Sequence, residues 1–211
     1  MKKNPLYQFE NIPVDSVVLE SLWPYHRAPK SKVLSLQKKG ELIRLKKGLY
    51  VVSPDETDKG LSLGLIANHL YGPSYVSRQW ALRYYGLIPE HVYLVRSMTI
   101  KHSREFRTPL GNFEYRNCSE DWFSIGIRQE QENGVNFLIA SPEKALCDTI
   151  VCTSGLNLRY KKEILTYLEE DIRFYMEDFV QMNPDIFDAC ARLGRKAKML
   201  STIANIIRHE R

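Results

Sequence analysis

A basic β-hairpin that directly follows a helix is the feature that most restricts how this chain can fold. Residues 38–54 read KKGELIRLKKGLYVVSP, and residues 41–52 alternate and branch as the strands of a short hairpin do. Gly40 is a favoured residue just past a helix end, and residues 46–48 supply the turn. Lysines and an arginine crowd the start and the turn of this hairpin, so the sequence predicts an anionic partner there.

The location of the positive charge is more informative than its total. The chain has 211 residues, a net charge of +5 and a pI near 8.9. Residues 27–47 hold eight lysines and arginines and one acid, Glu41. The net charge of this segment, +7 (eight minus one), is therefore larger than that of the whole chain. A basic run is often only a solvated face, but here a helix, a hairpin and the charge coincide within one short segment.

The helix before the hairpin has two different faces. Pro29 opens it, and at ~100° per residue Val33 and Leu36 share the face that would be buried. The opposite face carries small hydroxyls and lysines, namely Ser31, Ser35 and Lys38, with Lys32 and Lys39 at its shoulder. Such a surface can approach a DNA groove closely and bind phosphates.

A helix, a tight turn and a basic two-stranded ribbon follow one another in a winged helix-turn-helix. In that motif the helix enters the major groove and the wing touches the backbone or the minor groove. The sequence therefore predicts double-stranded DNA as the partner. The predicted DNA-binding residues are Arg27, Lys30, Ser31, Lys32, Ser35, Lys38, Lys39, Arg44, Lys46 and Lys47.

The rest of the chain predicts a larger mixed domain, so the expected fold class is α+β. We expect a winged helix-turn-helix domain over residues 1–55, an exposed linker, and an α+β domain with C-terminal helices over residues 61–211. Expected strands are 92–100, 105–108, 112–116, 122–128 and 135–139. Asn133-Gly134 predicts a hairpin turn, and Ser141 predicts the start of a helix.

The sequence favours a non-enzymatic cytoplasmic protein without metal or cofactor. The four cysteines show no pairing typical of a zinc site or a disulfide framework. The basic start lacks the apolar segment of a signal peptide, and no apolar run approaches the ~20 residues of a membrane span. No phosphate loop, dinucleotide fingerprint or nucleophile motif is present.

Three segments also carry a family resemblance. LQKKGELIRLKKGLYV, YVSRQWALRYYGLIPE and ASPEKALCDTI, in this order and spacing, resemble the successive signatures of AbiEi-type antitoxins of type IV toxin–antitoxin systems. The resemblance covers residues 15 to about 155, and the first motif includes Lys38, Lys39, Arg44, Lys46 and Lys47. It implies promoter binding, repression of the protein's own operon in phage defence, and functional neutralisation of a nucleotidyltransferase-like toxin without a stable complex.

Two other functions remain open from the residues alone. The basic arm could meet RNA or an acidic protein in a non-catalytic interaction module. Glu143 and Asp148 could belong to a Mg²⁺-dependent nuclease, although an acid in a first helical turn is favoured electrostatically, and Asp148 can pair with Lys144 four residues earlier.

The apolar stripe of the last helix also has two interpretations. Its members fall on one side of a helix: Met199, Leu200, Ile203, Ile206 and Ile207. We expect this stripe to pack on its own domain, and the alternative is a dimer or partner surface. The oligomeric state stays open at this point.

Overall fold

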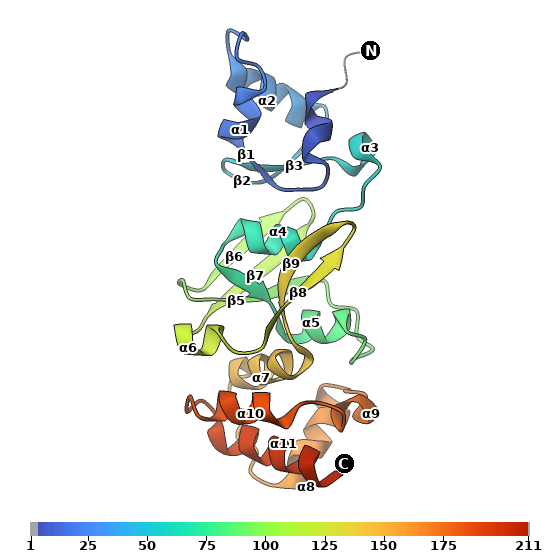
Figure 1. Ribbon diagram of the computed structural model, residues 1–211, viewed down its shortest axis with the longest axis vertical. Coiled ribbons are helices and arrows are strands. Elements are labelled where there is room, and N and C mark those ends of the chain that lie inside the picture. Colours follow the sequence, from blue (N-terminus) through green and yellow to red (C-terminus); the bar gives the residue numbers. More distant parts are fainter. Residues whose placement is uncertain (1–3, 211) are drawn as a thin grey trace.

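The computed structural model describes residues 4–210, which form two sheets stacked along one long axis with helices around each (Figure 1). We call residues 4–53 the N-terminal unit and residues 61–210 the C-terminal unit. The first contains a three-stranded sheet and the second a six-stranded sheet. The α+β class predicted from the sequence is confirmed.

The N-terminal unit places its helices on one face of a small antiparallel sheet. Its elements are η1 (Pro5–Phe9), β1 (Val14–Asp15), α1 (Ser16–Ser21), α2 (Pro29–Lys38), β2 (Leu42–Lys46) and β3 (Leu49–Val52). The strand order is β1-β3-β2, so β2 is an edge strand. Leu19, Val33 and Leu36 from the helices pack on the sheet in one buried cluster.

Local signals fix the helix ends in this unit. The Asp15 side chain accepts a hydrogen bond from the backbone N–H of Val17 at 2.8 Å, so α1 begins there. Pro29 occupies the first turn of α2, where its missing N–H costs nothing. Gly40 has a φ of +82°, and this left-handed conformation ends α2 as predicted.

Strand β3 is buried on both faces. Tyr50 and Val52 belong to the cluster beneath the helices of the N-terminal unit. Leu49 and Val51 point the other way, into the large core of the C-terminal unit, together with Leu45 of β2. The hairpin therefore lies between two cores, and its apolar residues are needed on each side.

The six-stranded sheet of the C-terminal unit has the order β6-β7-β5-β4-β9-β8. Its strands are β4 (Ser74–Val76), β5 (Leu94–Thr99), β6 (Arg104–Thr108), β7 (Gly111–Asn117), β8 (Ile127–Glu132) and β9 (Val135–Ala140). β5 pairs with β7 and β4 with β9 in parallel, and the other pairs are antiparallel. The β8–β9 turn is Asn133-Gly134, as predicted, with φ positive at both residues.

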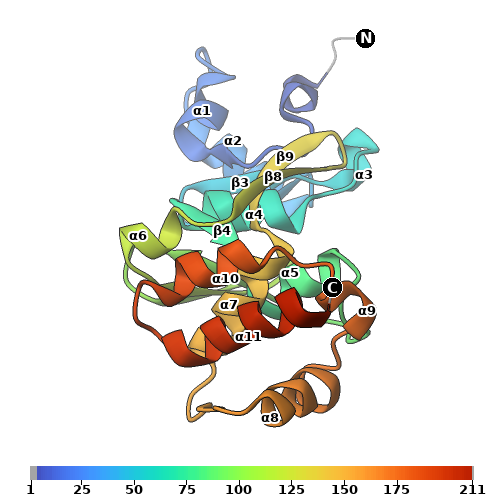
Figure 2. The same ribbon diagram turned by 60° about the horizontal axis from the view of Figure 1, so that its bottom comes forward.

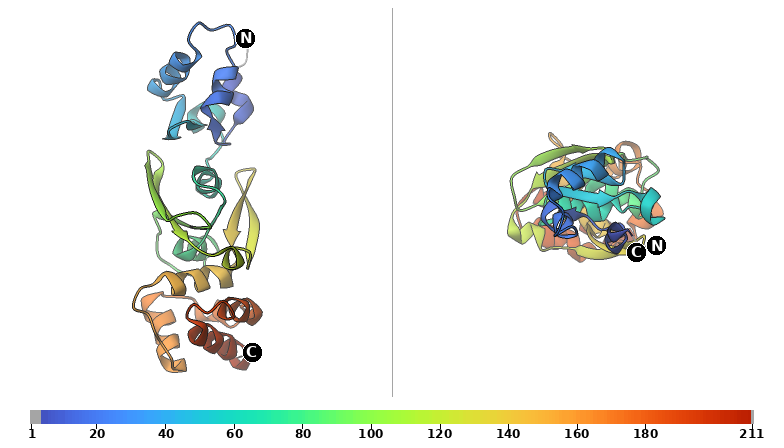
Figure 3. Two further views of the ribbon diagram at one scale, coloured as in Figure 1. Left: turned by 90° about the vertical axis from the view of Figure 1, so that its left-hand side faces the viewer. Right: turned by 90° about the horizontal axis from the view of Figure 1, so that it is seen from above.

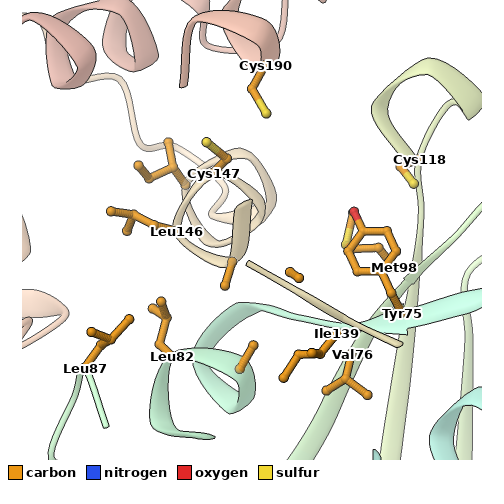
Figure 4. Packing of buried hydrophobic residues seen from close by; sticks show 14 of the residues in the cluster. Tyr75, Val76, Leu82, Leu87, Met98, Cys118, Ile139, Leu146, Cys147 and Cys190 are labelled. Atoms are coloured by element: carbon orange, nitrogen blue, oxygen red, sulfur yellow. The ribbon is translucent and has the colours of Figure 1, made fainter. Parts of the chain in front are cut away.

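Helices cover both faces of this sheet. Helix α4 (Leu63–Leu70) packs on β4 and β9, while α5 (Arg78–Tyr84) and α7 (Pro142–Cys152) pack against each other below the sheet. The left view of Figure 3 shows the β6–β7 and β8–β9 hairpins rising on either side of α4 toward the N-terminal unit. Figure 4 shows part of the core around α7, with Leu146 on the side of Leu82 and Leu87 and Tyr75 on the other side beside Met98.

The C-terminal helices close the core from below. They are α8 (Lys161–Thr166), the π-helical stretch η2 (Tyr167–Asp171), α9 (Met176–Phe179), α10 (Pro184–Ala191) and α11 (Ala197–Glu210). Helices α10 and α11 pack side by side, and α10 also contacts α7 (Figure 2). All five residues of the apolar stripe are buried, which confirms that the stripe packs on its own unit. None of the helices within residues 4–210 is both long and apolar enough to span a bilayer.

Three local predictions were wrong or incomplete. Residues 122–128 were expected as a strand, but Ser119 caps a helical turn, α6 (Glu120–Phe123), and β8 starts only at Ile127. The short central strand β4 was not predicted. The linker contains a helical turn, α3 (Pro54–Thr57).

The two units also meet through polar contacts at their junction. The buried Asn11 side chain donates hydrogen bonds to the carbonyls of Gly60 and Asn133, at 2.9 and 3.0 Å. The second of these carbonyls lies in the β8–β9 turn. The N-terminal unit is therefore held at the β8–β9 hairpin as well as through β2 and β3.

We predict that Ile203→Ala lowers the free energy of unfolding by about 2–5 kcal/mol, because it removes buried methyl groups and leaves a cavity. Ile203 is fully buried, whereas Asn205 on the same helix is exposed, so Asn205→Ala is the matched control. Urea denaturation measures both. An Ile203 variant with unchanged stability but altered sedimentation would instead identify the stripe as an interface.

Candidate nucleic-acid interface

Helix α2 presents a polar and basic face to solvent. Val33 and Leu36 point into the core, and the side chains on the other side are exposed. The exposed predicted residues on or next to this helix are Lys30, Ser31, Ser35, Lys38 and Lys39. Leu34 lies at the margin of this face and is half exposed. We call these five residues with Leu34 the α2 face.

The α2 face has no acidic counter-charge. Within residues 4–210, no lysine or arginine between positions 27 and 47 forms a salt bridge. The first turn of α2 contains no acid, so the positive end of the helix dipole is not neutralised by its own sequence. The α2 face is consequently suited to an anionic partner.

The loop before α2 continues this exposed surface. Arg27 is exposed, and Tyr25, two residues earlier, has its side chain wholly in solvent. Lys32 behaves differently, because it is only half exposed and its ammonium lies 5.9 Å from the centre of the Trp23 ring. This cation–π contact places the Lys32 stem along the side of α2 and leaves its charge near the surface.

The basic residues of the hairpin lie in two different environments. Arg44 and Lys47 are exposed. Lys46 instead turns toward the C-terminal unit, where its ammonium donates a hydrogen bond to the carbonyl of Leu70 at the end of α4 and lies 6.0 Å from the Phe106 ring. The sequence could not indicate this contact, because Leu70 and Phe106 are far away along the chain.

Lys46 has cationic neighbours that sequence reasoning did not include. Burial lowers the pKa of Lys46, and the nearby charges of Arg104 and Lys101 lower it further, while Asp15 opposes this. Lys101 and Arg104 come from the loop between β5 and β6 and the start of β6. The basic character of the hairpin therefore continues into the C-terminal unit.

A second group of charged residues is buried in the C-terminal unit. Asp148 on α7 accepts hydrogen bonds from Tyr75 at 3.0 Å, Ser77 at 2.6 Å and the Trp122 indole at 2.6 Å. The Lys144 ammonium lies 3.4 Å from the same carboxylate, as the spacing of four residues predicted, and donates to the Trp122 carbonyl. Every polar atom of this pair that the core encloses is thus used internally.

Glu143 likewise has a structural role. One carboxylate oxygen accepts from the Ser141 hydroxyl and the other from the backbone N–H of Asn183. The Ser141 hydroxyl in turn accepts from the backbone N–H of Lys144, so the predicted cap is confirmed. No group of His, Cys, Asp and Glu suited to a metal ion is found within residues 4–210.

A third cluster joins β5, β7 and the start of α5. The Glu114 carboxylate is buried. Its oxygens lie 2.8, 2.7 and 3.6 Å from guanidinium nitrogens of Arg78, Arg116 and Arg96. Burial raises the pKa of Glu114, but the hydrogen bonds and charges of Arg116 and Arg78 outweigh it and lower the pKa overall. This carboxylate therefore stays ionised and holds the three arginines together.

Neither a model of a known protein family nor a curated protein sequence matches this chain.

We predict that Asp148→Ala destabilises the protein by about 3–5 kcal/mol, because it leaves the buried Lys144 charge and three donors without their acceptor. Asp121→Ala is the control, since Asp121 is an exposed acid in α6. Thermal unfolding measures both variants. A stable, fully folded Asp148 variant would contradict the structural role assigned to this network.

Proposed function

We propose that the protein is a DNA-binding transcriptional repressor whose N-terminal unit is a winged helix-turn-helix. The observation that carries this proposal is the α2 face, which is exposed, basic and free of acids. The major groove is wide enough to admit an α-helix, and the exposed side of α2 carries the short side chains of Ser31 and Ser35.

The order of elements supports the same interpretation. Helix, strand, two helices and a two-stranded ribbon follow one another as η1, β1, α1, α2, β2 and β3, and β1 completes the small sheet beside β3. Helix α1 packs against α2, and α2 is then the helix expected to enter the groove.

Different side chains of the α2 face would contact different parts of the DNA. Ser31 and Ser35 are short and can donate or accept, so they can reach base edges in the groove. Lys30, Lys38 and Lys39 are long cations that would contact phosphates and release counterions. Arg27, Arg44 and Lys47 add exposed charge around the helix.

We further propose an antitoxin role, on the strength of the resemblance of the sequence to AbiEi-type antitoxins. In this proposal the protein binds the operator of its own operon in the cytoplasm and counters a nucleotidyltransferase-like toxin without forming a stable complex with it. The protein itself would not be an enzyme. The structural roles of Glu143 and Asp148 support this part, because both carboxylates are occupied by internal hydrogen bonds.

We predict that replacing Lys38 and Lys39 together by Ala weakens binding to all DNA sequences by a similar factor. Both side chains are exposed at the end of α2. Each lost phosphate contact should reduce the slope of log affinity against log salt by ~0.9. Fluorescence anisotropy with the upstream DNA of the operon, at several salt concentrations, measures the slope.

The control for this variant is Lys198→Ala with Lys162→Ala, which removes the same charge from two exposed positions of the C-terminal helices. If the Lys38 and Lys39 variant keeps the affinity and salt slope of the wild type, the α2 face does not bind DNA. A preference for single-stranded RNA over duplex DNA would favour the RNA-interaction alternative.

We predict a different result for Ser31→Ala combined with Ser35→Ala. These serines carry no charge, so the salt slope should remain that of the wild type. The ratio of the affinity for operator DNA to the affinity for unrelated DNA should fall, because a base contact is worth ~1–3 kcal/mol of discrimination. Competition with unrelated duplex DNA measures this ratio, and an unchanged ratio would exclude these serines from base recognition.

A further inference from the structure

The loop between β5 and β6 lies beside the turn of the N-terminal hairpin and brings additional cations to it. The Lys46 ammonium donates to the Leu70 carbonyl at the end of α4, and the Lys101 ammonium donates to the Gly72 carbonyl two residues further along the chain. Arg104, at the start of β6, completes the group. We call Lys46, Lys101 and Arg104 the junction cations.

Two aromatic rings hold the junction cations in place. The Arg104 guanidinium lies 5.0 Å from the Phe106 ring centre and 5.9 Å from that of Tyr71. The Lys101 ammonium lies 5.4 Å from the Tyr71 ring centre. The centres of the two rings are 5.8 Å apart, so the rings pack on each other and lie beside the cations.

The positive charge of this group is not neutralised within the protein. No junction cation forms a salt bridge inside residues 4–210, and Asp15 is the carboxylate that acts on Lys46 from a distance. The pKa of His69, on α4, is lowered by burial and by Lys46, so this neighbour adds no charge at neutral pH.

The contacts of the two lysines have an internal explanation, but those of Arg104 do not. Lys46 and Lys101 donate to carbonyls at and just beyond the end of α4, where cations are stabilised by the helix dipole. The Arg104 side chain, in contrast, makes no hydrogen bond to any residue from 4 to 210 and is exposed. The donors of its planar guanidinium therefore face solvent, where they are open to an oxyanion.

The β6–β7 hairpin, whose first strand begins at Arg104, lies on the side of the molecule that carries α2. In the left view of Figure 3, helix α2 in light blue and the β6–β7 hairpin in green are on the same side of the long axis. The edge strands of the two sheets, β2 and β6, contact each other there. Lys39 after α2, Arg44 on β2 and Arg104 on β6 are all exposed.

We propose that Arg104 extends the short wing and binds the phosphate backbone of the DNA duplex beside the segment held by α2, and that the exposed charge of Lys101 adds to the attraction there. The turn of the hairpin spans only residues 47 and 48 between its strands, and Lys46 is engaged at the junction. The C-terminal unit supplies the cations that this wing lacks. This inference rests on the proposed DNA-binding function.

The test replaces Arg104 and Lys101 together by Gln in the full-length chain. Arg107→Gln is the matched control, because Arg107 is exposed on the same strand, three residues further and hence on the opposite face. We expect the double variant to bind upstream DNA more weakly, with a salt slope reduced by ~0.9 for each lost contact. The control should bind as the wild type does.

A second measurement shortens the DNA from either end. Removing base pairs on the wing side should reduce the salt slope of the wild type to that of the Arg104 and Lys101 variant, and should leave the variant unchanged. A purely structural junction would lower the melting temperature of the variant while its salt slope stayed that of the wild type, and this result would overturn the inference.

The same series separates this inference from the proposed function. If the Lys38 and Lys39 variant loses affinity but the Arg104 and Lys101 variant does not, the α2 face binds DNA and the extended wing is wrong. If the wild type shows no salt-dependent affinity for duplex DNA, the proposed function fails, and the inference fails with it.

Discussion

Strand β3 is buried on both faces, and the arrangement of the two units depends on this. Tyr50 and Val52 close the small core beneath α1 and α2, while Leu49 and Val51 reach into the large core of the C-terminal unit. A full burial of each large apolar side chain is worth roughly 1.5–3 kcal/mol, so separating the units would expose a costly surface. The β2–β3 hairpin therefore belongs to both cores, and its orientation fixes that of α2.

The burial of the hairpin between two cores also changes the role of its basic turn. A wing that projects freely can place its lysines on the DNA backbone, but a wing that supports a second unit has one face occupied. Lys46 shows the result, since its ammonium binds the Leu70 carbonyl, whereas Lys47 remains exposed. The DNA-binding surface proposed here accordingly relies on α2 and its surroundings more than on the turn.

The features predicted well from the sequence are those that neighbouring residues decide. Pro29 and Gly40 set the ends of α2, Ser141 starts α7, and Asn133-Gly134 closes a hairpin, all through contacts within a few residues. The exposure of Ser31, Ser35 and Lys38 on α2 also followed from helical periodicity alone.

What the sequence left hidden depends on residues that are distant along the chain. Strand β4 has only three residues and is defined by its partners β5 and β9. Ser77 stands at the start of α5, but its hydroxyl donates a hydrogen bond to Asp148 and does not cap the helix. Lys101 and Arg104 gained significance only when the fold placed them beside Lys46.

The two-sided burial of β3 has a consequence for synthesis of the chain. The N-terminal unit leaves the ribosome first, and Leu45, Leu49 and Val51 then have no partner until α4 and the six-stranded sheet have been made. During this interval an apolar strand face is open to other nascent chains. Synthesis and folding of the second unit cover this face and so remove a site of aggregation.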